Sequence, residues 1–288
     1  MSPKPWNEKM PQHEGASNRW RQIRPFPNSV PRLAFIDFDG TLSLIRAGWM
    51  PIMRAQMFKA IRPLDHVETD GELMDRIETW IQENNGKPTW RQMERLHLEV
   101  EGRNGVSPGW REHLREFSDQ LMALVNPIKD KLRAKSINPS AVCVPGAHEL
   151  LKCLQLKGME LHLVSGTALE DVVEELELLG LSGFFQGRVH GPTPANPDFS
   201  KSNVLEALVP DPAERTNVLG IGDGPVEISL VAQNGGLAVG VARSECGTRL
   251  DAGVAKLLGE SGAHALVHDF KDASKFIAWL WSRLGESP

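Results

Sequence analysis

Short apolar runs of strand length, separated by helix-length segments, constrain the fold of this chain more than any other feature of its sequence. The runs are LAFIDF (33–38), LHLVS (161–165), GRVHG (187–191), VLGIGD (218–223), GLAVGVA (236–242) and AHALVHDF (263–270). Strands that alternate with helices are typical of a parallel sheet covered by helices on both faces. We therefore predict an α/β protein with a parallel sheet at its centre.

The long segment between the first two runs has a different pattern. From residue 44 to 139, apolar residues recur every three or four positions, as they do along amphipathic helices, and no strand pattern interrupts them. A segment of this length is large enough to form a small subdomain. We therefore predict an α/β core made of residues 33–43 and 140–288, with residues 44–139 inserted as an all-helical cap over the ends of its strands.

The first 32 residues differ from the rest in composition. They contain six prolines, few aliphatic residues, and six Lys or Arg against two Glu, with no helical or strand period. Such composition favours a flexible, basic, proline-rich N-terminal arm. Trp6, Trp20 and Phe26 give this arm apolar groups with which to dock on its own domain or on a second subunit.

Bulk composition excludes several classes of partner. A formal net charge of -5 does not indicate a nucleic-acid-binding protein, and no apolar run reaches the length of a membrane span. The three cysteines, Cys143, Cys153 and Cys246, lack CxxC spacing and are typical of reduced thiols. We expect a cytoplasmic monomer or homodimer without a nucleic-acid or membrane partner.

Four short motifs follow predicted strands or begin predicted helices. They are Asp37-Phe38-Asp39-Gly40-Thr41, Ser165-Gly166-Thr167, Lys201 in DFSKSNVLEAL, and GIGDGPVEI with Asp223 and Glu227. The carboxyl ends of parallel strands meet at one edge of a sheet, where ligands of open α/β sheets bind. Two aspartates as close as Asp37 and Asp39 repel each other unless a cation shares their site.

In their order and context, these motifs resemble those of the haloacid dehalogenase (HAD) superfamily over about residues 33–275. The resemblance is to its phosphatase-like branch, which includes phosphoglycolate phosphatases and β-phosphoglucomutases and carries a helical cap between the first two motifs. It implies a Rossmann-like core, a Mg²⁺ cofactor and a covalent aspartyl-phosphate. A hard cation such as Mg²⁺ suits carboxylate, phosphate and water oxygens.

The resemblance also implies roles for the acidic residues. Asp37 is the expected nucleophile and a metal ligand. Asp39 is expected to bind the metal through its main-chain carbonyl and to exchange protons through its side chain. Asp223 is expected to bind the same metal. Glu227 stands where the family often has aspartate, so it binds the metal either directly or through water.

The remaining motif residues are expected to contact the phosphoryl group. These are Thr41, Ser165, Gly166 and Lys201, of which Lys201 also screens the charge of Asp37. In the predicted cap, Gly86 and Pro88 interrupt the helices within NNGKPTW (84–90). This loop offers Lys87, Thr89 and Gln92 to a substrate if it faces the site, and otherwise forms a solvent-exposed turn.

The function that follows is a Mg²⁺-dependent phosphatase acting on a small phosphorylated metabolite. A phosphomutase acting on a sugar phosphate and a non-catalytic binding protein on the same scaffold are the alternatives. Dehalogenases of this fold lack the second aspartate of the first motif, and the cap lysine expected of a phosphonatase is missing. Family analogy alone suggests a sugar phosphate or a phosphoglycolate-like acid as the substrate.

Overall fold

A seven-stranded sheet forms the centre of the computed structural model, which describes residues 19–196, 199–243 and 250–284. Its strands are β1 (Trp20–Gln22), β2 (Leu33–Ile36), β3 (Glu160–Val164), β4 (Val189–His190), β5 (Val218–Gly222), β6 (Leu237–Val241) and β7 (Ala265–Val267). They lie in the order β1-β7-β6-β5-β2-β3-β4, and all neighbours are parallel except β1 and β7. The predicted α/β class is therefore confirmed.

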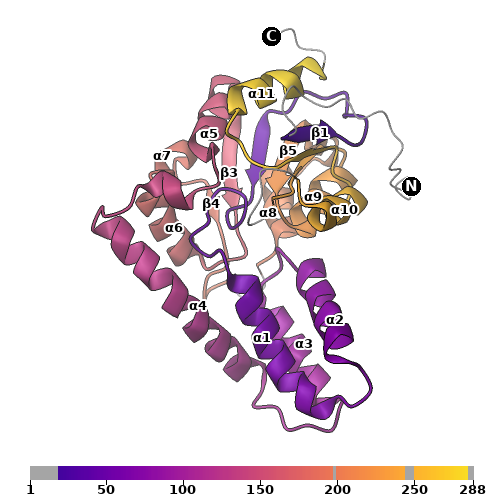
Figure 1. Cartoon of the computed structure of the whole chain (residues 1–288). Helices are drawn as coiled ribbons and strands as arrows, with labels where there is room; N and C mark the ends of the chain where they lie inside the picture. The colour runs from indigo at the N-terminus through magenta and orange to yellow at the C-terminus, as the bar shows by residue number, and fades with distance from the viewer. Residues whose placement is uncertain (1–18, 197–198, 244–249, 285–288) are drawn as a thin grey trace.

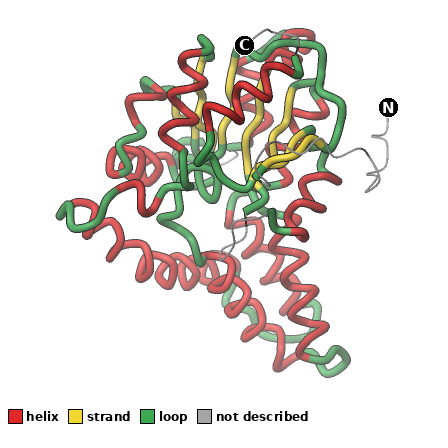
Figure 2. Tube along the Cα trace, turned by 45° about the horizontal axis from the view of Figure 1, so that its top comes forward, coloured by secondary structure: helices red, strands yellow, loops and turns green. Residues whose placement is uncertain are grey.

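Helices cover both faces of the sheet (Figure 2). One face packs against α5 (Ala147–Leu156), α6 (Leu169–Leu178), α7 (Ser182–Phe185) and α11 (Ala273–Ser282). The other packs against α8 (Lys201–Leu208), α9 (Pro225–Gln233) and α10 (Ala252–Glu260). Successive side chains of a strand point to opposite faces, so Ala34 and Ile36 enter the first layer while Phe35 enters the second. This two-sided burial explains why β2, β5, β6 and β7 contain no polar side chains.

The segment between β2 and β3 forms a helical insertion, defined here as residues 44–139. Its helices are α1 (Trp49–Ile61), α2 (Asp70–Glu83), α3 (Thr89–Glu101) and α4 (Trp110–Arg133), with a 3₁₀ turn at Arg62–Leu64. All its residues are described, and none lies in a β-strand. The helices bury one apolar stripe each against one another, including Met53, Ile77 and Leu96. Figure 1 shows the insertion gathered beyond one end of the sheet.

Strand β1 departs from the arm predicted for residues 1–32. Trp20 pairs with Val267 at the edge of the sheet, and its ring is 4% exposed, with its centroid 5.6 Å from that of Phe276 on α11. Trp20–Gln22 is thus an ordered strand and not a flexible arm, and Trp20 docks on its own domain, one of the two alternatives for this residue. Burial of one large ring and pairing along a sheet edge order a strand that is too short to show a period. Residues 1–18, including Trp6, lie outside the described part.

Two further 3₁₀ turns complete the core, at Pro139–Val142 and Pro212–Asn217. The first leads from the insertion back to α5, and the second leads into β5. Among the described residues, no helix is both long and apolar enough to cross a membrane.

Candidate active site

The three central strands end level with one another, and each is followed by a predicted site residue. Ile36 of β2 is paired with Leu163 of β3 and Ile221 of β5, and Asp37 continues the ladder by donating its N–H to the Ile221 carbonyl (2.9 Å). Ser165 follows β3 and Asp223 follows β5. Parallel register therefore brings together Asp37 and two side chains that each lie more than a hundred positions from it in the sequence.

Lys201 lies between two carboxylates at the start of α8. Its ammonium donates to Asp37 Oδ1 and to Glu227 Oε2, each at 2.8 Å, and all three side chains are buried. Burial lowers the pKa of Lys201, but the charges of Asp37 and Glu227 outweigh that effect and raise it above its usual value. Lys201 is therefore a fixed cation of this site. Ser200 caps α8 by accepting from Asn203 N–H (3.1 Å), which holds Lys201 at the first helical position.

Asp223 completes a group of three carboxylates with Asp37 and Glu227, whose ligand atoms lie within 4.8 Å of one another. It accepts from the Thr41 hydroxyl (3.3 Å) and from the Asn85 amide (3.4 Å). Burial raises the pKa of Asp223, and the negative charges of Asp37 and Glu227 raise it further. Burial likewise raises the pKa of Glu227. Lys201 alone leaves this group with excess negative charge, so a cation is the natural additional occupant.

The donor set fits a hard divalent cation. Carboxylate oxygens from Asp37 and Asp223, with the main-chain carbonyl of Asp39, are the ligands that Mg²⁺ prefers. Glu227 differs, because both its oxygens already accept hydrogen bonds: Oε2 from Lys201, and Oε1 from the Gly224 N–H (2.8 Å). This favours a role for Glu227 in orienting Lys201 beside the metal ligands, rather than in binding the metal directly.

Gly40 lets the first motif turn beneath Asp223. Its φ is +73°, and a Cβ there would lie 2.3 Å from Asp223 Oδ2. No other residue fits that approach. Thr41, expected to contact phosphate, is fully buried and directs its hydroxyl to Asp223 instead. The structure thus assigns the Thr41 side chain to positioning Asp223, since the turn at Gly40 points it away from the cavity.

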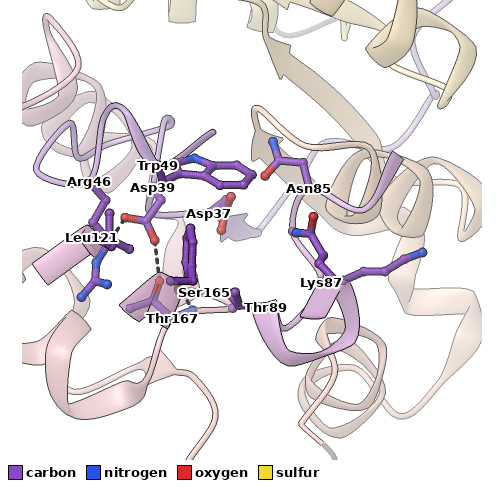
Figure 3. Close-up of a pocket in the computed structure, with 14 residues that line it drawn as sticks. Asp37, Asp39, Arg46, Trp49, Asn85, Lys87, Thr89, Leu121, Ser165 and Thr167 are labelled. Atoms are coloured by element: carbon purple, nitrogen blue, oxygen red, sulfur yellow. Dashed lines mark hydrogen bonds and ion pairs between the residues drawn. The ribbon is translucent and has the colours of Figure 1, made fainter. Parts of the chain in front are cut away.

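Asp39 is held by two residues, Thr167 and Arg46. Its Oδ2 accepts from the Thr167 hydroxyl (2.8 Å), and its Oδ1 lies 3.9 Å from Arg46 Nε (Figure 3). Burial raises the pKa of the Asp39 carboxyl, which Arg46 and Thr167 only partly counteract. Asp37 and Asp39 thus have different surroundings: the Lys201 ammonium donates to Asp37 at 2.8 Å, whereas Asp39 accepts from a hydroxyl group and has Arg46 as a more distant cation.

Ser165 and Gly166 line a cavity of about 100 Å³ together with Asp37 and Asp39. Ser165 Oγ accepts from the Thr167 N–H (3.0 Å), which shapes the loop after β3. Figure 3 shows Ser165 and both aspartates around this cavity, as expected for phosphoryl contacts. We call it the phosphate cavity below.

A loop of the helical insertion, residues 84–88, covers the phosphate cavity. Apart from the Asn85 contact with Asp223, a Cβ built on Gly166 would meet the Gly86 carbonyl at 3.5 Å, and one built on Gly224 would meet the Asn85 carbonyl at 3.1 Å. Gly86 has φ of +88°, and its own Cβ would lie 3.0 Å from Glu227 Oε2. The insertion therefore touches both the Ser165 and the Asp223 loops.

Three residues of the insertion were predicted as substrate contacts, and all three line the phosphate cavity. Thr89 begins α3, and Gln92 follows one turn later with its buried Oε1 lacking a hydrogen-bond partner among the described residues. Lys87 differs, because its ammonium donates to Asn84 Oδ1 (2.9 Å) and points away from the cavity (Figure 3). Gln92 is thus the best placed of the three to meet a ligand.

Arg46, Asn85 and Thr167 belong to this site but were not predicted from the sequence. Arg46 Nη2 lies 2.8 Å from Glu175 Oε1 and 3.0 Å from Asp171 Oδ2, so it joins the insertion to α6. Burial raises the pKa of Glu175 to about 7, despite the opposing effect of Arg46. Thr167 ends the predicted motif Ser165-Gly166-Thr167, although no role was predicted for it, and Asn85 lies within the loop NNGKPTW, so the sequence had already marked both segments. Nothing local indicated Arg46.

This arrangement of core and helical insertion is the fold seen in solved structures described as β-phosphoglucomutases and as a HAD family hydrolase. A β-phosphoglucomutase from Clostridium difficile has a TM-score of 0.55 at 12% identity, covering 89% of this chain and 98% of its own. A putative β-phosphoglucomutase from Bacteroides vulgatus has a TM-score of 0.54 at 17% identity, covering 90% and 92%. The predicted resemblance is therefore confirmed for the fold.

A third similar structure is a HAD family hydrolase from Deinococcus radiodurans R1 with bound phosphate and sodium. Its TM-score is 0.50 at 13% identity, covering 90% of this chain and 99% of its own. No protein-family model and no curated protein matches the sequence.

Proposed function

We propose that this protein is a Mg²⁺-dependent phosphatase that hydrolyses a small phosphorylated metabolite. The observation that carries the proposal is that the two aspartates have different contacts. Asp37 lies against Lys201 and within the carboxylate group, while Asp39 is partly buried, accepts a hydrogen bond from Thr167 and has a raised pKa. One carboxylate is thus suited to nucleophilic attack and the other to proton transfer.

In the first step, an Asp37 oxygen attacks phosphorus and the bond from phosphorus to the alcohol oxygen breaks. Asp39, in its protonated form, gives its proton to the departing alcohol. In the second step, water attacks the aspartyl-phosphate and gives a proton to Asp39, and the bond from phosphorus to Asp37 breaks. Inorganic phosphate leaves, and both carboxyl groups return to their starting states.

The rest of the site serves the phosphoryl oxygens. Ser165 and Gly166 line the cavity proposed for the phosphoryl group, and Lys201 keeps positive charge beside Asp37. Bound Mg²⁺, held by Asp37, Asp223 and the Asp39 carbonyl, would supply further compensation of negative charge. Glu227 holds Lys201 in position. The loop at 84–88 excludes water during the first step.

The proposal is tested with 4-nitrophenyl phosphate as a generic aryl substrate. We expect turnover in Mg²⁺, loss of turnover in EDTA, and recovery when Mg²⁺ is restored. Asp37→Asn is expected to reduce turnover to background, whereas Asp75→Asn, at an exposed position of α2, keeps it. Full activity of Asp37→Asn, or activity unaffected by EDTA, would contradict the proposal.

A phosphomutase is the second candidate, because two similar structures carry that description and the first step would be the same. Mutase activity would convert a sugar phosphate to its isomer without releasing inorganic phosphate, so a phosphate-release assay separates the two. If neither reaction occurs and a phosphate ester still binds, the non-catalytic alternative holds.

Absence of nucleic-acid and membrane partners, a monomeric or homodimeric state and a cytoplasmic location remain predictions. Cys143 and Cys153 are free thiols, and Cys246 lies outside the described residues.

A further inference from the structure

A second cavity opens directly beside the phosphate cavity. Its volume is about 610 Å³, a size typical of sites for small organic ligands. Residues shared by the two cavities are Arg46, Thr89, Phe117, Leu121, Gly166 and Thr167. Six shared residues place the two spaces side by side. A phosphate ester bound at Ser165 therefore has this larger space available for its alcohol portion.

Aromatic and aliphatic side chains form most of the wall of the larger cavity, which we call the aromatic pocket. Trp90 and Trp110 stand with ring centroids 5.9 Å apart and planes inclined by 46°, and both are partly exposed. Leu114, Phe117 and Leu121 from α4 line the same space. Phe117 and Leu121 are buried in the core of the insertion, which keeps that part of the wall rigid. Flat, apolar ligands are the natural occupants of such a wall.

The charged residues of the aromatic pocket are already engaged. Arg46 is paired with Asp171 and Glu175, and the Arg111 guanidinium lies 4.5 Å from the centre of the Trp110 ring. An anionic group on the alcohol portion would have to compete with these contacts. The pocket therefore favours a neutral, apolar alcohol over an acid or a second phosphate.

Thr167 lies between the aromatic pocket and Asp39, the proposed proton donor. It lines both cavities, and its hydroxyl donates to Asp39. The ester oxygen that receives that proton must lie near Asp39, which lines the phosphate cavity and accepts from the Thr167 hydroxyl beside the aromatic pocket. Beyond this oxygen, the alcohol extends between Trp90 and Trp110 on one side and the loop after β3 on the other.

We infer that the substrate is the phosphate monoester of an apolar, ring-bearing alcohol, whose ring binds in the aromatic pocket. This inference rests on the proposed phosphatase function. It differs from the sugar phosphate or phosphoglycolate-like acid that family analogy suggests, because those alcohols would set hydroxyl or carboxylate groups against tryptophan and leucine side chains.

The test compares 3-phenylpropyl phosphate with propyl phosphate. Both release a primary alkanol, so the intrinsic reactivity of the ester is matched and only the ring differs. We expect kcat/KM for the phenyl substrate to be at least about tenfold higher, as apolar pockets discriminate by such factors. Ser118 of α4 also lines the pocket, and Ser118→Trp fills it, so this ratio should fall toward one. Gln120→Trp, at an exposed position of the same helix, should leave the ratio unchanged.

Should Ser118→Trp fail to fold by circular dichroism, Trp110→Ala tests the same wall by removing a ring, and the ratio should fall severalfold. Equal kcat/KM for the two esters, or a ratio that neither variant changes, would overturn the inference and leave the phosphatase proposal standing. If neither ester is hydrolysed, the phosphatase proposal fails. Calorimetric titration with 3-phenylpropan-1-ol then decides: binding that Ser118→Trp abolishes supports the pocket, and no binding refutes it.

Discussion

Replacing Lys201 with methionine tests how much the positive charge of this side chain stabilises the buried carboxylates. Methionine has a similar length and fills the same space, but it removes the ammonium that donates to Asp37 and Glu227 at 2.8 Å each. Lys201 is 3% exposed, Asp37 7% and Glu227 0%, so water cannot take over these contacts. Two buried carboxylates, with Asp223 beside them, would lose their common cation.

The expected loss follows from this burial. Removing one partner of a buried ion pair costs about 3–5 kcal/mol, because the other charge stays behind unpaired. We therefore expect the free energy of unfolding in EDTA at pH 8 to fall by about that amount. The loss should be smaller near pH 5.5. Burial already raises the pKa values of Asp223 and Glu227, so these carboxyls can take up protons there and relieve the repulsion.

Urea unfolding followed by circular dichroism measures this loss. Lys59→Met is a matched control, because Lys59 is 83% exposed and its ammonium lies 3.8 Å from Glu116 Oε1; we expect a change below about 0.5 kcal/mol. If Mg²⁺ binds the carboxylates, saturating Mg²⁺ should restore part of the lost stability, about 2.7 kcal/mol at a hundred times its Kd. A loss below about 1 kcal/mol in EDTA, or one no larger than that of Lys59→Met, would show that Lys201 does not balance the buried charge.

Three further predictions follow. Asp39→Asn should lower turnover of alkyl phosphates by about 10²–10⁴ and of aryl phosphates far less, since good leaving groups need no proton. Mass spectrometry after acid quench should then find about 80 Da on Asp37, the covalent intermediate. Gly86→Ala should lower kcat/KM by about tenfold or more, because its Cβ would lie 3.0 Å from Glu227 Oε2, whereas Gly158→Ala, with equally positive φ but open space, should not. Burial lowers the pKa of His264 from 6.5 to about 4. Protonation of this side chain therefore favours the unfolded state, and the full contribution to stability is present only above pH 6.5. About 3 kcal/mol of the free energy of unfolding should be lost as the pH falls from 6.5 to 4.

Each of these predictions has a result that contradicts it. Phosphate found on another residue would remove Asp37 as the nucleophile. Equal activities of the Gly86→Ala and Gly158→Ala variants would mean that the loop at 84–88 does not close on the site. Urea unfolding of His264→Gln as a function of pH should lack the acid-dependent loss, and an unchanged pH dependence would assign that loss to another group.

Local patterns in the sequence were enough to predict the α/β class and the positions of most strands. Strands β2 and β4 to β7 fall within predicted apolar runs, and β3 begins one residue before its run, because strands buried on both faces are largely apolar. Strand β1 was not predicted, since its three residues are ordered by a neighbouring strand and helix rather than by a pattern of their own.

For the site, the sequence by itself determined the residues that follow strands or begin helices. Asp37, Ser165, Lys201 and Asp223 could be predicted because strand ends and helix starts are marked by nearby residues, and parallel strands end at one edge. Their hydrogen-bond partners were a matter of tertiary structure. The contact of Asp39 with Thr167 spans 128 positions.

Only the packing of the insertion against the core decided the remaining features. It placed Arg46 between Asp39 and α6, and Asn85 on Asp223 across 138 positions. It also opened the aromatic pocket beside the phosphate cavity, with Trp90 and Trp110 lining it as well as packing against each other. The physical reason is that helical periodicity marks which side of a helix is apolar, but not which surface that side will meet.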